Sequence, residues 1–251
     1  MAAPTRTIRG SASNRTRRSS TTELTPHSAP LKCRREAYEL LAAHVPFLER
    51  PRALLNAAVA ISLHELEDLE PGYVERRLQG IADRILARCG RGSDRALLAH
   101  AHEVLFDEEG LRGDDRNDYR SQSSYVSRVL ETQRGLPITL CLIYKNVLER
   151  LGFEVFGVNA PGHFLAAIEM DGSMTLVDPF FGGLPLTESE AIRRIETSAE
   201  VKIPRGERLL KPATHRQWIT RMLGNLEHIF YHRQERENLA AMLELRGLLP
   251  R

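Results

Sequence analysis

Two residues near the middle of the chain, His163 and Asp178, have the types and the spacing for acid–base chemistry. Asp171-Gly172 predicts a two-residue hairpin turn that pairs Met170 with Ser173. This register makes His163 and Asp178 diagonal neighbours on one face of the hairpin, about 7–8 Å apart at the backbone. A carboxylate holds an imidazole in one tautomer and makes it a better general base. A structural hydrogen bond or a turn cap explains the same pattern, and spacing alone favours that alternative.

A cysteine at the start of a helix packed on this hairpin would complete a thiol enzyme site, because free N–H groups there activate a thiol. The helix that we expect from Pro137 is the right element, but its first turn holds no cysteine. Cys141 lies one turn further in among apolar neighbours, which favours an inert core residue. Thr139 is most simply a polar residue of the first turn. A catalytic set of Cys141, His163 and Asp178 stays the competing hypothesis, and activation of water by His163 and Asp178 alone is a third.

The elements that must position these residues follow from hydrophobic periodicity. Apolar residues recur at three- and four-residue spacings from residue 32 to about residue 106, which predicts a helical first half. The polar residues 107–124 predict a surface loop. Further helices are expected at 125–133, 137–151 and 188–195, and strands at 153–158, 163–170 and 174–178. Two apolar stripes, one around Trp218 and one after residue 238, predict a C-terminal antiparallel helix pair.

Composition limits the function classes. The chain has 251 residues, 42% of them hydrophobic and 27% charged, so it can bury a sizeable core. It has no run of eighteen uncharged apolar residues, which argues against a transmembrane helix. Its three cysteines form no CxxC pair, so neither a disulfide framework nor a zinc site is indicated, and a cytoplasmic location is predicted.

The charge is concentrated at the N-terminus. Residues 1–35 hold eight basic residues and one acidic residue, whereas the remaining residues hold 27 basic and 32 acidic ones. Residues 1–31 therefore predict a disordered basic tail, with an organelle transit peptide or a nucleic-acid-binding arm as alternatives. The mildly acidic body does not indicate a nucleic-acid groove.

Other motifs are too sparse to carry chemistry. His100-x-His102 and His64-Glu65 each lack a third metal ligand, and no phosphate-binding glycine loop is present. Gly182-Gly183 is explained by a turn. We therefore predict neither a metal nor a cofactor.

Three phrases in order resemble the SirB-type family of the transglutaminase-like superfamily: residues 134–140 (Arg-Gly-Leu-Pro-Ile-Thr-Leu), 157–165 (Gly-Val-Asn-Ala-Pro-Gly-His-Phe-Leu) and 176–183 (Leu-Val-Asp-Pro-Phe-Phe-Gly-Gly). Residues 119–125 depart from the family's phrase. The resemblance implies a papain-like core in which His163 and Asp178 match the family's histidine and aspartate, while Pro137 occupies the usual cysteine position. The motif residues implied to shape the cleft are Gly135, Pro137, Thr139, Pro161, Gly162, Pro179, Gly182 and Gly183.

Together these observations predict an α+β protein with a helical region at 32–124, a transglutaminase-like core at 125–200 and a C-terminal helix pair at 201–251. The leading functional hypothesis is a degenerate transglutaminase-like protein that binds a protein or peptide partner, with regulatory consequences. The alternative is a thiol-dependent amide hydrolase or acyltransferase that uses Cys141, His163 and Asp178. The sequence leaves the oligomeric state open.

Overall fold

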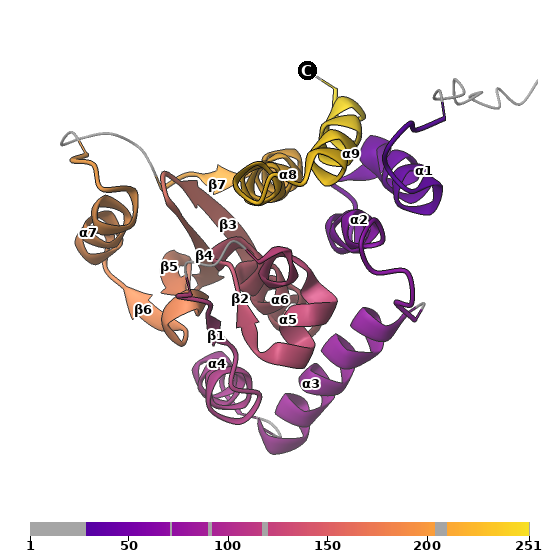
Figure 1. Cartoon of the computed structure of the whole chain (residues 1–251). Helices are drawn as coiled ribbons and strands as arrows, with labels where there is room; N and C mark the ends of the chain where they lie inside the picture. Colours follow the sequence, from indigo (N-terminus) through magenta and orange to yellow (C-terminus); the bar gives the residue numbers. More distant parts are fainter. Residues whose placement is uncertain (1–28, 71, 90–91, 117–119, 204–209, 251) are drawn as a thin grey trace, which may run out of the picture.

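The computed structural model describes residues 29–70, 72–89, 92–116, 120–203 and 210–250. The predicted α+β class is confirmed: helices surround a five-stranded antiparallel sheet of order β6-β5-β4-β3-β7 (Figure 1). Most of the predicted basic tail, residues 1–28, lies outside the described residues. None of the described helices has the length and apolar character needed to span a bilayer.

The sheet is built around the hairpin that carries the two candidate residues. Met170 pairs with Ser173 as predicted, and Asp171 and Gly172 both have positive φ, at 53° and 72°. These angles suit a tight hairpin turn whose twist matches that of the strands. The strands are β3 (Glu154–Ala160), β4 (His163–Met170), β5 (Ser173–Asp178), β6 (Leu184–Leu186) and β7 (Pro212–Ala213).

The two faces of the sheet pack against different helices. Alternate residues of β4, such as Phe164 and Ala166, point into the main core with α6 (Pro137–Arg150). The intervening residues Leu165 and Ala167 form a smaller core with α7 (Glu188–Ala199). The sheet therefore lies between α6 and α7, as Figure 1 shows.

The N-terminal region is helical, as the periodicity predicted. Ser93 caps α4, because its side chain accepts a hydrogen bond from the Ala96 amide. The elements of this region are α1 (Arg35–His44), the 3-10 helix η1 (Val45–Phe47), α2 (Ala53–Ser62), α3 (Tyr73–Cys89), α4 (Asp94–His102) and the π-helix η2 (Glu103–Glu108).

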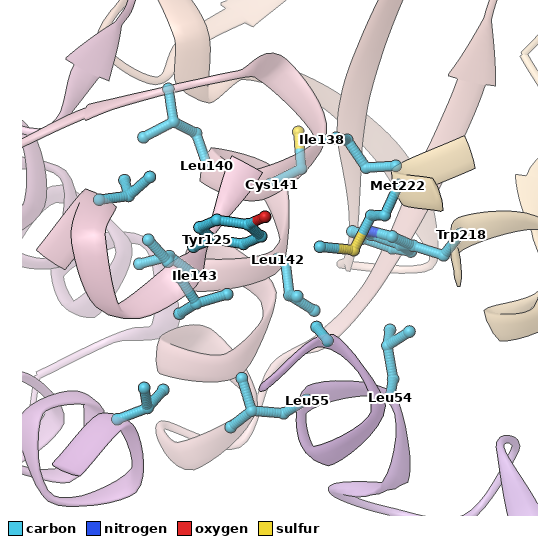
Figure 2. Packing of buried hydrophobic residues seen from close by; sticks show 14 of the residues in the cluster. Leu54, Leu55, Tyr125, Ile138, Leu140, Cys141, Leu142, Ile143, Trp218 and Met222 are labelled. Atoms are coloured by element: carbon cyan, nitrogen blue, oxygen red, sulfur yellow. The ribbon is translucent and has the colours of Figure 1, made fainter. Parts of the chain in front are cut away.

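The main core joins this region to the C-terminal helix pair. Helix α8 (His215–His232) packs against α9 (Arg236–Gly247), and the predicted stripe around Trp218 is buried. Figure 2 shows Leu54 and Leu55 of α2 and Trp218 and Met222 of α8 meeting the side chains of α6. Burial of apolar surface from all parts of the chain fixes the position of α6.

The segment predicted as a surface loop is partly ordered and buried, so that prediction was wrong. It contains β1 (Arg112–Gly113), which pairs in parallel with β2 (Arg134–Gly135), and the 3-10 helix η3 (Ser121–Ser124). Three serines of η3 are buried. Their burial comes from contacts with α5 (Val126–Thr132) and α8, which composition does not reveal.

Candidate functional site

His163 and Asp178 form a buried hydrogen-bonded pair. Nε2 of His163 lies 3.0 Å from Oδ2 of Asp178, and the two side chains are 3% and 0% exposed. The hairpin register brings them to the same end of the ribbon. Strand β5 ends at Asp178, where the 3-10 helix η4 (Pro179–Phe181) begins, and the Phe180 amide donates to Oδ1 of Asp178 at 3.1 Å.

A third residue, Arg194 of α7, completes the environment of Asp178. Its Nη1 lies 3.2 Å from Oδ2, and its guanidinium carbon lies 4.2 Å from the centre of the Phe181 ring. Both carboxylate oxygens therefore have donors, as a buried charge requires. Sequence reasoning missed Arg194, because nothing in its own segment relates it to a carboxylate sixteen residues away on another element.

Cys141 lies in the core and outside the pair. Its side chain is fully buried, and its sulfur donates a hydrogen bond to the Phe164 carbonyl at 3.5 Å. Burial, with a smaller contribution from the charge of Asp178, raises the thiol pKa well above its ordinary value. Figure 2 shows Cys141 among the core residues Ile138, Leu140 and Leu142. In this position the thiol is protonated at neutral pH.

Thr139, the weaker nucleophile candidate, is also buried. Its hydroxyl donates to the Ser124 carbonyl at 3.3 Å and so ties the first turn of α6 to η3. This bond supports the interpretation of Thr139 as a structural polar residue.

The motif glycines and prolines shape the strand ends around the pair. Gly162 follows Pro161 in the turn between β3 and β4 with φ +65°, and an added Cβ would lie 2.7 Å from the Ala199 backbone. Gly183 has φ +72°, and an added Cβ would collide with the Phe106 ring. These two positions exclude any side chain. Of the remaining motif residues, Pro179 opens η4, Gly182 follows it, and Gly135 pairs with Gly113.

A cavity of about 710 Å³ opens beside His163, within the size range of ligand-binding sites. Its floor includes the start of α6, where Pro137 is the first helical residue. His163 lines the cavity; its Nε2 is engaged by Asp178, and its Nδ1 makes no hydrogen bond within the described residues. The cavity is also lined by Asp114, Asp115, Arg116, Ser198, Arg221 and Asn225.

The other candidate histidines have protein partners. His102 Nε2 lies 2.7 Å from the Tyr144 hydroxyl, and His64 Nε2 lies 3.1 Å from Oδ1 of Asn238. Over the ranges that the structure describes, no three His, Cys, Asp or Glu side chains gather as metal ligands would.

Comparison with known proteins agrees with this architecture. The family model described as "Transglutaminase-like superfamily" matches residues 73–224, which is more than half of the chain. The chain belongs to the transglutaminase-like superfamily. The match runs from the start of α3 into α8, so it includes the His163–Asp178 pair and most of the residues that line the cavity.

Several relatives that are similar to this chain bear the name UPF0162 protein. The one from Xylella fastidiosa strain 9a5c is 32% identical over 181 residues, which is 70% of this chain and 64% of that protein. Its counterpart in strain Temecula1 is 32% identical over 192 residues, 75% of this chain and 68% of that protein. The Pseudomonas aeruginosa relative is 27% identical over 207 residues, 80% and 73% of the two chains. This chain thus spans somewhat less than two thirds of the first relative. No solved structure matches significantly.

Proposed function

We propose that this protein is a degenerate, SirB-type transglutaminase-like protein that binds a peptide segment of a partner protein in the cavity beside His163, with a regulatory role. The observation that carries the proposal is the cavity itself: it combines an unengaged Nδ1 of His163 with a helix start that presents Pro137 in place of a thiol. The three sequence motifs support the SirB-type assignment. The predicted segments, 32–124, 125–200 and 201–251, and the cytoplasmic location are part of the same proposal.

The buried pair then has a positioning role. Asp178 holds the His163 ring through Nε2, and Arg194 and the Phe180 amide hold Asp178 in turn. In the neutral ring this leaves Nδ1 without a proton, as a hydrogen-bond acceptor aimed at an occupant. A peptide N–H group is the donor that fits such an acceptor.

The alternative, a thiol-dependent amide hydrolase or acyltransferase, has less support. Such an enzyme needs a thiolate within reach of both the histidine and the substrate. Cys141 is fully buried, is hydrogen-bonded to Phe164 and does not line the cavity.

The test is selection of peptides from a random display library on the full chain, followed by fluorescence polarisation with the selected peptides. Ser198 is an exposed residue of α7 that lines the cavity, whereas its neighbour Thr197 is exposed but does not line it. Ser198→Trp should fill the cavity and weaken binding at least about tenfold, and Thr197→Trp should bind as the wild type does. Equal binding by both variants, or no selected peptide, would reject the proposal.

A further inference from the structure

The cavity beside His163 is lined by charged side chains of both signs, including Asp114, Asp115 and Arg221. Resting on the function proposed above, we propose that the cavity recognises a carboxylate of the bound peptide and that Arg221 of α8 is its receptor. The carboxylate is either an acidic side chain or the peptide C-terminus. Both sources present the same planar pair of oxygens to a guanidinium.

Arg221 is a half-buried cation whose partners are all neutral. Its Nε lies 3.3 Å from Oδ1 of Asn225, and its Nη1 lies 3.3 Å from Oδ1 of Asn159 and 3.4 Å from the Ala160 carbonyl. These distances exceed those of good N–H···O hydrogen bonds. Within the described ranges Arg221 forms no ion pair.

Burial without a counter-ion has a cost that an anion would remove. Burial lowers the pKa of Arg221 below its ordinary value, because the charged form has lost part of its hydration. Arg150, another partly buried arginine, does have a counter-ion, since its Nη2 lies 2.6 Å from a carboxylate oxygen of Glu75. A ligand carboxylate would form with Arg221 the kind of charged hydrogen bond that Glu75 forms with Arg150.

Charged side chains of both signs line the cavity, among them Asp114, Asp115 and Arg116. Arg116 is engaged within the protein, because Asp114 accepts hydrogen bonds from Arg116 and Ser123. Arg120 also lines the cavity and has interactions of its own. Arg221 lines the cavity on α8 with Asn225 and His228, and its hydrogen-bond acceptors within the described residues are all neutral, so we assign the carboxylate to Arg221. His163 Nδ1 provides the second contact by accepting a peptide N–H group.

The experiment measures how substitutions at two arginines of α8, Arg221 and Arg216, change the affinity for the peptides selected from the display library. Arg221→Gln removes the proposed receptor, Arg221→Lys keeps the charge but loses the planar fork, and Arg216→Gln removes an equal charge outside the cavity. We expect Arg221→Gln to weaken binding of a carboxylate-bearing peptide at least tenfold, which corresponds to about 1.4 kcal/mol. The affinity of Arg221→Lys should lie between those of the wild type and Arg221→Gln. Arg216→Gln should have little effect on the affinity. Thermal unfolding of each variant verifies folding.

The peptide is varied in parallel to identify the carboxylate. One form has its Asp and Glu replaced by Asn and Gln, and another has an amidated C-terminus. The form that lacks the essential carboxylate should bind the wild type weakly. Its affinity for the Arg221→Gln variant should be the same, because the interaction with Arg221 is already lost. Peptides that bind equally well without any carboxylate would overturn this inference and leave the proposed function standing, whereas the absence of any binding peptide would overturn both.

Discussion

Arg194 of α7 and His163 of β4 share one oxygen of Asp178: Nη1 of Arg194 lies 3.2 Å from Oδ2, and Nε2 of His163 lies 3.0 Å from it. Strand β4 and helix α7, which packs on one face of the sheet, are thus tied through a single buried atom. The arrangement fixes the orientation of the imidazole and secures α7 to the hairpin. It also makes Arg194 the residue whose removal tests how strongly Asp178 depends on its partners.

Arg194→Met should destabilise the protein by about 1–3 kcal/mol, because Asp178 keeps His163 and the Phe180 amide but loses its cationic partner. Methionine is of similar length but also lacks the guanidinium that lies over the Phe181 ring, so the loss combines the ion pair with this cation–π contact. Urea unfolding followed by circular dichroism measures it. Arg193→Met, an exposed neighbour on the same helix, is the matched control and should change stability by less than about 0.5 kcal/mol. Equal stability of the two variants would show that the ion pair contributes nothing.

Gly183→Ala should destabilise the fold by about 2–4 kcal/mol, because its positive φ and the Phe106 ring both oppose a Cβ. Gly182→Ala is the control: its φ is +76° as well, but an added Cβ would meet open space. It should therefore lose only about 1 kcal/mol. Thermal unfolding of the two variants separates backbone strain from the collision, and similar losses would contradict the packing described for Gly183.

The three cysteines should differ sharply in reactivity. In the folded protein at neutral pH, the half-buried Cys89 should react with iodoacetamide, and Cys141 should react at least about a hundredfold more slowly. Cys33 should also be protected, because burial, assisted by the charge of Glu244, raises its pKa to about 12. Peptide mapping by mass spectrometry identifies the labelled sites, with urea-unfolded protein as the fully reactive control. Rapid labelling of Cys141 in the folded state would restore the thiol-enzyme hypothesis.

Stability should fall between pH 6.5 and pH 4 because of His102. Burial lowers the pKa of this residue from 6.5 to about 4, so the unfolded chain takes up the proton over that interval and the folded chain does not. The contribution of neutral His102 to the free energy of unfolding is fully present above pH 6.5. It decreases as the pH falls, and the loss reaches about 3 kcal/mol at pH 4. His102→Gln should remove this part of the pH dependence in urea unfolding curves measured from pH 7 to pH 4. Parallel curves for the two proteins would refute the assignment.

The sequence was most informative where local chemistry determines the structure. Asp171-Gly172 set the hairpin register, because few residue pairs adopt the positive φ angles of a tight turn. The register in turn predicted that the His163 and Asp178 side chains lie close together, and in the structure they are hydrogen-bonded. Pro137 likewise predicted the first residue of α6, since its fixed φ suits a helix start.

The rest of the site depends on contacts between distant segments. Arg194 and Arg221 lie on helices whose amphipathic patterns predict only which residues face the core. The serines of η3 have polar side chains that indicate a surface loop, but packing against α5 and α8 buries them. In each case the contact joins separate elements, such as β5 with α7 or η3 with α8, and periodicity within one segment gives no signal for it.

The proline at the start of α6 has a consequence for whatever enters the cavity. Pro137 has no backbone N–H group. A ligand carbonyl oxygen at this turn therefore contacts a methylene of the proline ring and receives no hydrogen bond from residue 137 that would polarise it. Pro137 also brings no sulfur lone pair to attack the carbonyl carbon. On the function proposed here, an occupant departs with all its covalent bonds unchanged, and the residence time, not turnover, is the quantity that selection can tune.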